Sequence, residues 1–126
     1  MNVLLDTCAL LALARGDLPK KAAAALRSAP EASVSAVSPW EVAIKAAAGK
    51  LRLQEPPMQW FLGVSERYEL RELPLDAHVA CAAAALPLIH RDPFDRVLVA
   101  LAQAYALTVL TSDENIAKYP GVKTLW

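Results

Sequence analysis

The chain has 126 residues, the size of one ordinary domain with one hydrophobic core, so we expect a single domain over residues 1–126 and set multi-domain organisations aside. Hydrophobic residues make up 56% of the sequence, above the roughly 45–50% usual in soluble chains, which predicts that a partner covers part of the apolar surface. Thirteen basic residues balance thirteen acidic ones, so nucleic-acid binding would need a local basic patch.

The first residues are apolar but carry no targeting or membrane signal. No basic residue precedes the apolar stretch and Asp6 interrupts it, which makes it a poor signal peptide. The uninterrupted apolar run from Cys8 to Ala14 is far shorter than the roughly 20 residues that span a bilayer. Cys8 and Cys81 have neither zinc nor disulfide spacing, so we expect reduced, buried thiols in a cytoplasmic protein with no membrane partner.

Apolar strand-like runs alternate with helical patterns in the first half of the chain. The alternation predicts a strand over residues 3–5, helices over 7–15 and 19–29, a strand over 33–37, and helices over 38–48 and 58–69. Ser38, Pro39 and Glu41 have the pattern of a capping box, with a hydroxyl at the N-cap, proline at the first helical position and glutamate at the third.

The second half continues the alternation. It predicts a short strand over residues 70–73, a helix capped by Asp76 that ends before Pro87, and a long amphipathic helix through 106 that Asp92 caps. A β-branched strand follows over 108–111, then a helical turn at Ser112 and Asp113, and an edge strand over 123–126. Without hairpin signals, this order implies right-handed crossovers and a parallel sheet with helices on both faces.

Four acidic residues stand where strands or linking segments give way to helices. They are Asp6, Glu41, Asp95 and Asp113. In an open parallel sheet, the carboxyl ends of the strands share one edge, so the three aspartates should converge there, and the helix of the glutamate can lean over the same edge. Converging carboxylates bind a hard cation such as Mg²⁺, and such a site can cleave a phosphodiester with water as the nucleophile.

Some of these acids also have a structural explanation. Glu41 suits the capping box and an i,i+4 ion pair with Lys45, and Asp92 suits an N-cap, which leaves Asp95 without a structural role. Asp6 is harder to explain structurally because an acid directly after an apolar strand is costly to desolvate unless a cation or donors compensate. Considered together, the four acids favour a metal site.

The motifs around these acids resemble those of one known family. Residues 4–11 (LLDTCALL) look like the opening motif of PIN-domain ribonucleases, and residues 38–45 (SPWEVAIK) resemble their second acidic motif. Residues 90–96 (HRDPFDR) resemble the third motif, and residues 111–113 (TSD) resemble the fourth. The resemblance covers nearly the whole chain and is specific at the level of the VapC-type toxins of toxin–antitoxin pairs. One departure is Cys8, where histidine is frequent.

The resemblance implies a PIN-like three-layer α/β sandwich, with a central parallel sheet of four or five short strands and helices on both faces. It implies an endoribonuclease that depends on Mg²⁺ or Mn²⁺, hydrolyses RNA by metal-activated water, forms a homodimer and is neutralised by a cognate antitoxin. Carried onto this sequence, Asp6 and Asp95 match the best-established metal ligands. Glu41 matches the acid that orients metal or water, and Asp113 matches the more variable fourth acid.

Basic residues near the motifs are candidate phosphate contacts, which position an RNA strand without reading its bases. They are Lys45, Lys50, Arg52, Arg91 and Arg96. His90 is interpreted as a surface residue that precedes a helix, because no zinc spacing links it to His78.

Two rival hypotheses remain at this point. The first is a catalytically inactive PIN-like interaction module, which would be expected to lose one of the acids. The second is a receiver-like phosphoacceptor domain, which would need an acidic neighbour for Asp6 and a lysine after the last strand.

Overall fold

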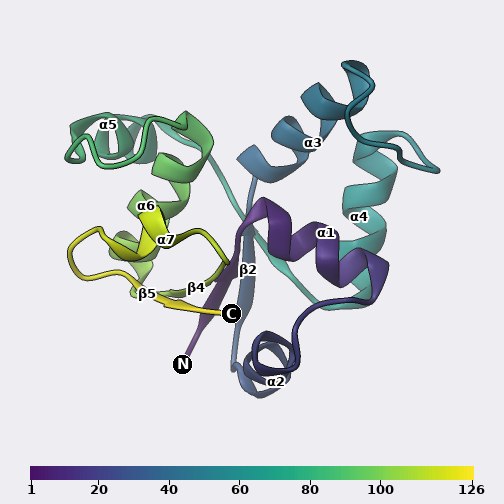
Figure 1. Cartoon of the computed structure of the whole chain (residues 1–126), viewed down its shortest axis with the longest axis horizontal. Helices are drawn as coiled ribbons and strands as arrows, with labels where there is room; N and C mark the ends of the chain where they lie inside the picture. Colours follow the sequence, from purple (N-terminus) through teal and green to yellow (C-terminus); the bar gives the residue numbers. More distant parts are fainter.

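The computed structural model describes residues 1–126, in which a five-stranded sheet lies between helices (Figure 1). The strands are β1 (Val3–Leu5), β2 (Ala32–Ser35), β3 (Arg71–Leu73), β4 (Thr108–Leu110) and β5 (Lys123–Leu125). All neighbouring strands pair in parallel, in the order β3-β2-β1-β4-β5. The predicted parallel sheet with helices on both faces is confirmed.

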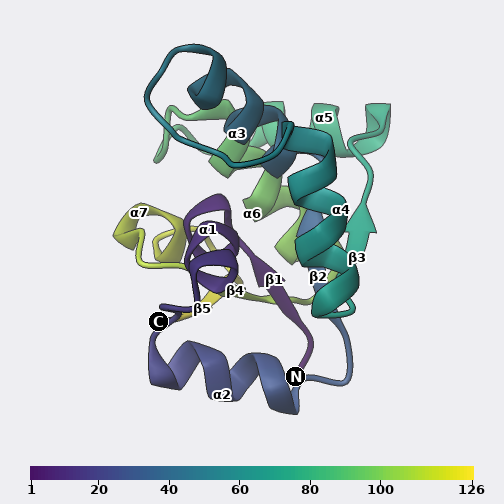
Figure 2. The ribbon, with the colours of Figure 1, turned by 90° about the vertical axis from the view of Figure 1, so that its right-hand side faces the viewer.

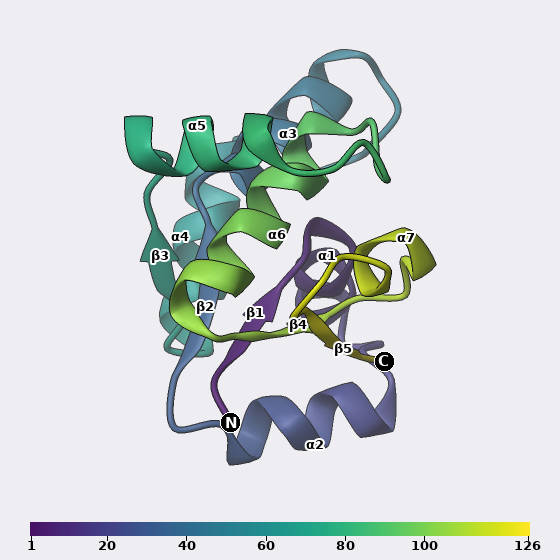
Figure 3. The same ribbon diagram turned by 90° about the vertical axis from the view of Figure 1, so that its left-hand side faces the viewer.

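Seven helices surround this sheet. They are α1 (Thr7–Arg15), α2 (Lys20–Ser28), α3 (Val37–Ala47), α4 (Pro57–Arg67), α5 (Ala77–Ala85), α6 (Pro93–Tyr105) and α7 (Glu114–Ala117). Figure 1 shows α5, α6 and α7 on one side of the sheet and α1 and α4 on the other. In Figures 2 and 3, α2 lies beside the N-terminus, at the opposite end of the molecule from α3. No helix has both the length and the apolar character needed to cross a bilayer.

The side chains of β1 alternate between the two faces of the sheet, which explains why two hydrophobic cores form. Val3, Leu4 and Leu5 are all fully buried, but successive side chains of a strand point to opposite faces. Leu4 therefore packs into the core beneath α5, α6 and α7, whereas Val3 and Leu5 pack into the core beneath α1 and α4. A strand that is buried on both faces reads as an uninterrupted apolar run, and this run is visible in the sequence.

The strand order places β1 in the middle of the sheet, where the direction of chain progression reverses. β1 pairs with β2 on one side and with β4 on the other. In open α/β sheets, ligands bind beyond the carboxyl ends of the strands at such a reversal. The residues that follow β1 and β4 are Asp6 and Thr111–Asp113, so the predicted acidic segments lie at this position.

The capping box predicted at the start of α3 is wrong. The helix begins at Val37, Ala36 is its N-cap, and no side chain caps it. The Ser38 hydroxyl instead lies 3.1 Å from the Thr7 hydroxyl in a buried contact between α3 and α1. A tertiary hydrogen bond therefore replaces the local one, and Glu41 is free of the capping role.

The prediction of buried thiols is also wrong. Cys8 on α1 and Cys81 on α5 are both free and exposed. Cysteine is most often buried in proteins, but these two positions fall on solvent-facing sides of their helices.

Candidate active site

Asp6 lies where β1 turns into α1. Its backbone N–H donates to the Leu110 carbonyl of β4 at 3.2 Å, and its Oδ1 accepts from the Ala9 N–H at 2.7 Å as the N-cap of α1. The side chain is buried, with only 5% of the residue exposed. Burial raises the pKa of Asp6, as do the negative charges of Asp113 and Glu41, although hydrogen bonds from Thr111 and Ala9 oppose the rise.

Asp95 projects from the first turn of α6. Asp92 caps that helix by accepting from the Phe94 N–H at 2.9 Å, as the sequence predicted, so Asp95 has no capping role. Its side chain is 17% exposed. Burial is the main cause that raises the pKa of Asp95 to about 7, and the charges of Asp92, Asp113 and Glu41 add to it while His90 opposes it.

Glu41 reaches the site from α3. Its side chain is 12% exposed, and its Oε2 lies 2.9 Å from Lys45 Nζ, which forms the predicted i,i+4 ion pair. Its other oxygen, Oε1, is buried and has no hydrogen-bond partner. A buried carboxylate oxygen without a donor is energetically unfavourable, so Oε1 has the capacity to accept from a water or to ligate a cation.

Asp113 caps α7 and meets His90. Its Oδ1 accepts from the Asn115 N–H at 2.8 Å, and its Oδ2 lies 2.9 Å from His90 Nε2. Burial works against ionisation, but the hydrogen bonds from His90 and Asn115 outweigh it and lower the pKa of Asp113. The sequence interpretation of Asp113 as the start of a helical turn is confirmed.

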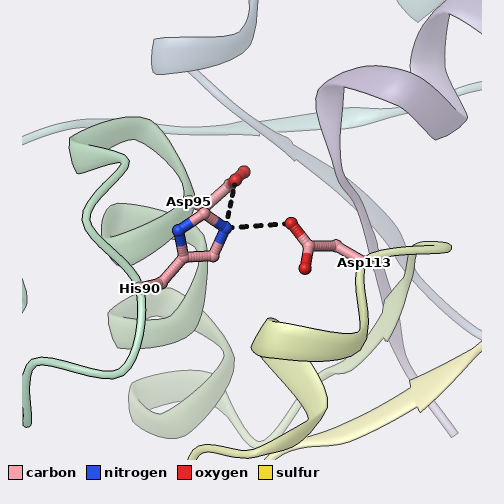
Figure 4. Close-up of side chains that lie close together, drawn as sticks. All are labelled: His90, Asp95 and Asp113. Carbon is pink, nitrogen blue, oxygen red and sulfur yellow. Dashed lines mark hydrogen bonds and ion pairs between the residues drawn. The ribbon is translucent and has the colours of Figure 1, made fainter.

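His90 is the residue that sequence reasoning missed. Its Nε2 lies 3.0 Å from Asp95 Oδ2 as well as 2.9 Å from Asp113 Oδ2, so the imidazole joins two of the predicted acids (Figure 4). One ligand atom from each of these three residues falls within 4.8 Å of the others. Burial lowers the pKa of His90, but the hydrogen bond to Asp113 and the negative charges of Asp95, Asp113 and Asp92 raise it overall.

The structure thus places the four predicted acids around one region. Asp95 and Asp113 meet directly through His90, while Asp6 and Glu41 lie outside this tight cluster. The negative charges of Glu41 and Asp113 nevertheless raise the pKa values of both Asp6 and Asp95. Raised pKa values of this kind are expected where carboxylates lie near one another.

The donor set fits a hard divalent cation. Mg²⁺ prefers carboxylate and water oxygens in an octahedral arrangement. The buried Asp6 and the half-buried Asp95, whose pKa values are raised, and the buried Oε1 of Glu41, which has no donor, are groups that such an ion would stabilise. Asp6, Asp95 and Glu41 retain oxygens that can serve as ligands, whereas both oxygens of Asp113 already have partners in the chain.

The five basic residues that were predicted to contact phosphate have different surroundings. Arg96 directs its guanidinium onto backbone carbonyls of the same chain, which favours a structural role over the predicted phosphate contact. Lys45 is engaged with Glu41. Lys50, Arg52 and Arg91 are exposed and form no ion pair.

An apolar groove runs beside the acids. It has a volume of about 440 Å³ and lies between α3, α5 and α6. Trp40 and Phe94 line it, with ring centroids 5.1 Å apart at an interplanar angle of 87°, and Trp40 remains 55% exposed. Because Trp40 precedes Glu41 and Phe94 precedes Asp95, the groove adjoins the acidic site.

Comparisons with known proteins agree with this architecture. The model of the PIN domain family matches residues 3–122. Ribonuclease VapC22 of Mycobacterium tuberculosis is 30% identical over 112 residues, which cover 86% of this chain and 85% of that protein.

Solved structures share the fold at lower sequence identity. VapBC2 from Rickettsia felis, bound to a DNA fragment from its promoter, gives a TM-score of 0.71 at 13% identity, over 99% of this chain and 98% of that one. A toxin–antitoxin complex from Klebsiella pneumoniae gives a TM-score of 0.66 at 22% identity, over 95% and 94% of the two chains.

Proposed function

Because this chain belongs to the PIN domain family, we propose that it is a divalent-cation-dependent endoribonuclease that acts as the toxin of a toxin–antitoxin pair. The observation that carries the proposal is the group formed by buried Asp6 and half-buried Asp95 and Glu41, which interact with one another and have raised pKa values or a donor-free oxygen. A fold alone does not establish chemistry, but this arrangement is one that a phosphodiesterase needs. The relative named a ribonuclease supports the same activity.

Asp6 and Asp95 would hold the cation, with Glu41 and Asp113 completing its surroundings. Mg²⁺, or Mn²⁺ in its place, would supply Lewis acidity that lowers the pKa of water and offsets charge on the phosphate. Ligation requires ionised carboxylates, so Asp95 must release the proton that it retains near neutral pH in the free protein.

Glu41 is suited to handle the attacking water. Its Oε2 is fixed by Lys45, and its Oε1 has no partner in the chain, so Oε1 can accept a hydrogen bond from water. In the hydrolysis, the water oxygen bonds to phosphorus, the bond from phosphorus to the leaving ribose oxygen breaks, and that oxygen takes up a proton. A carboxylate that orients the water and accepts its proton acts as general base in this scheme.

RNA would approach over the exposed basic residues. Lys50, Arg52 and Arg91 have no acidic partners, so they can contact phosphates, which would position the strand without specifying its bases. Because the chain has no net charge, individual basic residues such as these must supply the electrostatic attraction.

The exposed apolar surface supports the antitoxin and the homodimer as partners. Trp40, Ile44, Met58 and Leu62, on α3 and α4, have between 47% and 57% of their surface exposed. Apolar surface of this kind on adjacent helices suits an amphipathic partner segment or a second copy of the chain. The structural neighbour from Klebsiella pneumoniae is a toxin–antitoxin complex, which favours the antitoxin for part of this surface.

Neither rival hypothesis has an observation in its favour. An inactive module would be expected to lack one of the acids, and all four are present. A receiver-like domain would need an acidic residue beside Asp6, where Leu5 is buried in the core and Thr7 contacts Ser38.

Purified protein incubated with RNA tests the activity. Cleavage within the strand is expected with Mg²⁺ or Mn²⁺ and is expected to stop with a chelator, because the proposed reaction needs the cation to activate the water. Denaturing gel electrophoresis of end-labelled RNA measures the products. Cleavage that persists in chelator would contradict the proposal, because a metal-independent nuclease contaminant or mechanism would then be responsible.

Size measurement tests the partners. Light scattering of the isolated chain is expected to give twice the monomer mass, and co-expression with the product of the neighbouring gene is expected to give a larger complex with no RNA cleavage. A monomer that gains no mass and stays active after co-expression would contradict both partner assignments.

A further inference from the structure

His90 contacts two acids that come from different parts of the chain. Asp95 belongs to α6, and Asp113 belongs to the turn after β4, so no local sequence relation holds their carboxylates together. The Nε2 atom of His90 bridges them at 3.0 and 2.9 Å (Figure 4). The contact with Asp113 has the geometry of a hydrogen bond, and the contact with Asp95 is a close polar approach.

The other nitrogen of the ring indicates which role His90 has. The backbone N–H of Asp92 donates to His90 Nδ1 at 3.3 Å, so Nδ1 serves as the acceptor and carries no proton. The hydrogen bond that one imidazole nitrogen makes sets the state of the other, which means that Nε2 carries the proton. A protonated Nε2 donates to carboxylates and has no lone pair to offer a cation.

The segment before α6 is built to hold this ring in place. The Arg96 guanidinium donates to the carbonyls of Leu86 at 2.9 Å, Pro87 at 3.1 Å and His90 at 3.2 Å. The His90 N–H donates to the Tyr119 hydroxyl at 2.8 Å, and Tyr119 is almost fully buried. The backbone on both sides of the imidazole is therefore fixed without regular secondary structure.

We propose that His90 is a positioning residue of the cation site: its Nε2–H donates to Asp113 while Nε2 lies against Asp95, which keeps the two carboxylates together, and Arg96 and Tyr119 fix the segment that carries the ring. This role rests on the proposed cation site. His90 itself stays outside the coordination sphere. It contacts Oδ2 of both acids, so Oδ1 of Asp95 would be available to a cation.

Cation affinity should report this role directly. Hydrogen-bond partners of metal ligands typically contribute about 10- to 100-fold to metal affinity. The variant His90→Leu, which has no donor, is therefore expected to bind Mn²⁺ about 10- to 100-fold more weakly, measured from the loss of the free-ion electron paramagnetic resonance signal. His90→Gln is expected to recover most of the affinity, because its amide can donate from a position near that of Nε2.

Two further variants serve as a control and as an alternative test. His78→Leu changes the other histidine, which is exposed on α5, and is expected to bind Mn²⁺ like the parent. If His90→Leu does not fold, judged by its melting temperature, Tyr119→Phe tests the same role, because it removes the hydroxyl that accepts from His90 and keeps the buried ring. Tyr119→Phe is expected to weaken Mn²⁺ binding severalfold.

Ring-nitrogen spectra separate a donor from a ligand. In the His78→Gln variant, His90 is the only histidine, so a long-range ¹H–¹⁵N spectrum reports its Nε2 without ambiguity. Nε2 is expected to remain protonated with and without saturating Mg²⁺. An unprotonated Nε2 in the Mg²⁺ form would overturn the proposal, since the ring would then coordinate the ion.

The outcomes separate this inference from the proposed function. Unchanged Mn²⁺ affinity in folded His90→Leu, or a His90→Gln variant as weak as His90→Leu, would overturn the positioning role alone. A parent chain that binds Mn²⁺ but cleaves no RNA would overturn the ribonuclease proposal and leave the positioning role standing. A parent chain that binds no Mn²⁺ would overturn both.

Discussion

Asp6→Asn is expected to abolish RNA cleavage while it leaves the fold intact or makes it more stable. Asparagine caps a helix about as well as aspartate, so the hydrogen bond from the Ala9 N–H to Oδ1 can be kept. The change removes a buried charge that burial and neighbouring acids disfavour. It also removes a proposed cation ligand, and even outer partners of metal ligands contribute about 10- to 100-fold, so we expect a loss of more than about a hundredfold.

Rates of RNA cleavage and urea unfolding, measured on the same preparation, check this result. Asp17→Asn is the matched control, because Asp17 is exposed and pairs only with Arg15, and it should keep the activity of the parent. A loss of activity together with unchanged or increased stability would indicate a lost cation ligand, whereas a loss of both would indicate a damaged fold. Cleavage by Asp6→Asn at the parental rate would remove Asp6 from the site.

Asp95→Asn is expected to stabilise the cation-free protein at pH 8 and to have much less effect at pH 4. Folding raises the pKa of Asp95 from 3.8 to about 7. The stability that protonated Asp95 contributes is therefore fully present below about pH 4 and is lost as the pH rises through 7. At 1.36 kcal/mol per pKa unit, the parent should lose roughly 2–4 kcal/mol relative to the variant across this window.

Urea unfolding of both proteins at several pH values, with chelator present, measures the difference. Saturating Mg²⁺ is expected to restore the stability of the parent at pH 8, because an ion that binds only the folded state adds about 2.7 kcal/mol at a hundredfold excess over its dissociation constant. Asp95→Asn should gain much less stability from Mg²⁺. A gap between the two proteins that does not change with pH would show that Asp95 is ionised freely in the folded state.

The fold was predictable because short stretches of the sequence determine most of its strands and helices. The central strands β1 and β4 are short and buried and lead into helices capped by Asp6 and Asp113, and Asp76 and Asp92 cap their helices as expected. Element boundaries were less accurate. The start of α3 was misplaced because Ser38 and Glu41 match a local capping pattern, whereas the folded chain uses Ser38 to contact Thr7, 31 residues away.

The site was only partly predictable for a similar reason. The four acids could be found because each follows a recognisable structural boundary. His90 could not, because its position depends on carbonyls gathered around Arg96 and on the Tyr119 hydroxyl, and no periodic pattern encodes such contacts. The neighbouring proline, the cap at Asp92 and the HRDPFD run were the available signals, and they do not reveal that an imidazole bridges two acids.

The central position of β1 affects when the protein can become active during synthesis. The strand β1 emerges from the ribosome first. It pairs with β2 through Val3 and Ala32 and with β4 through Val3 and Thr108, so β4, its second partner, is made much later. Asp6 and Glu41 are made early, yet they remain without Asp113 until nearly the whole chain has been translated. An unfinished polypeptide therefore lacks part of the proposed cation site, so we expect no RNA cleavage before the chain is nearly complete.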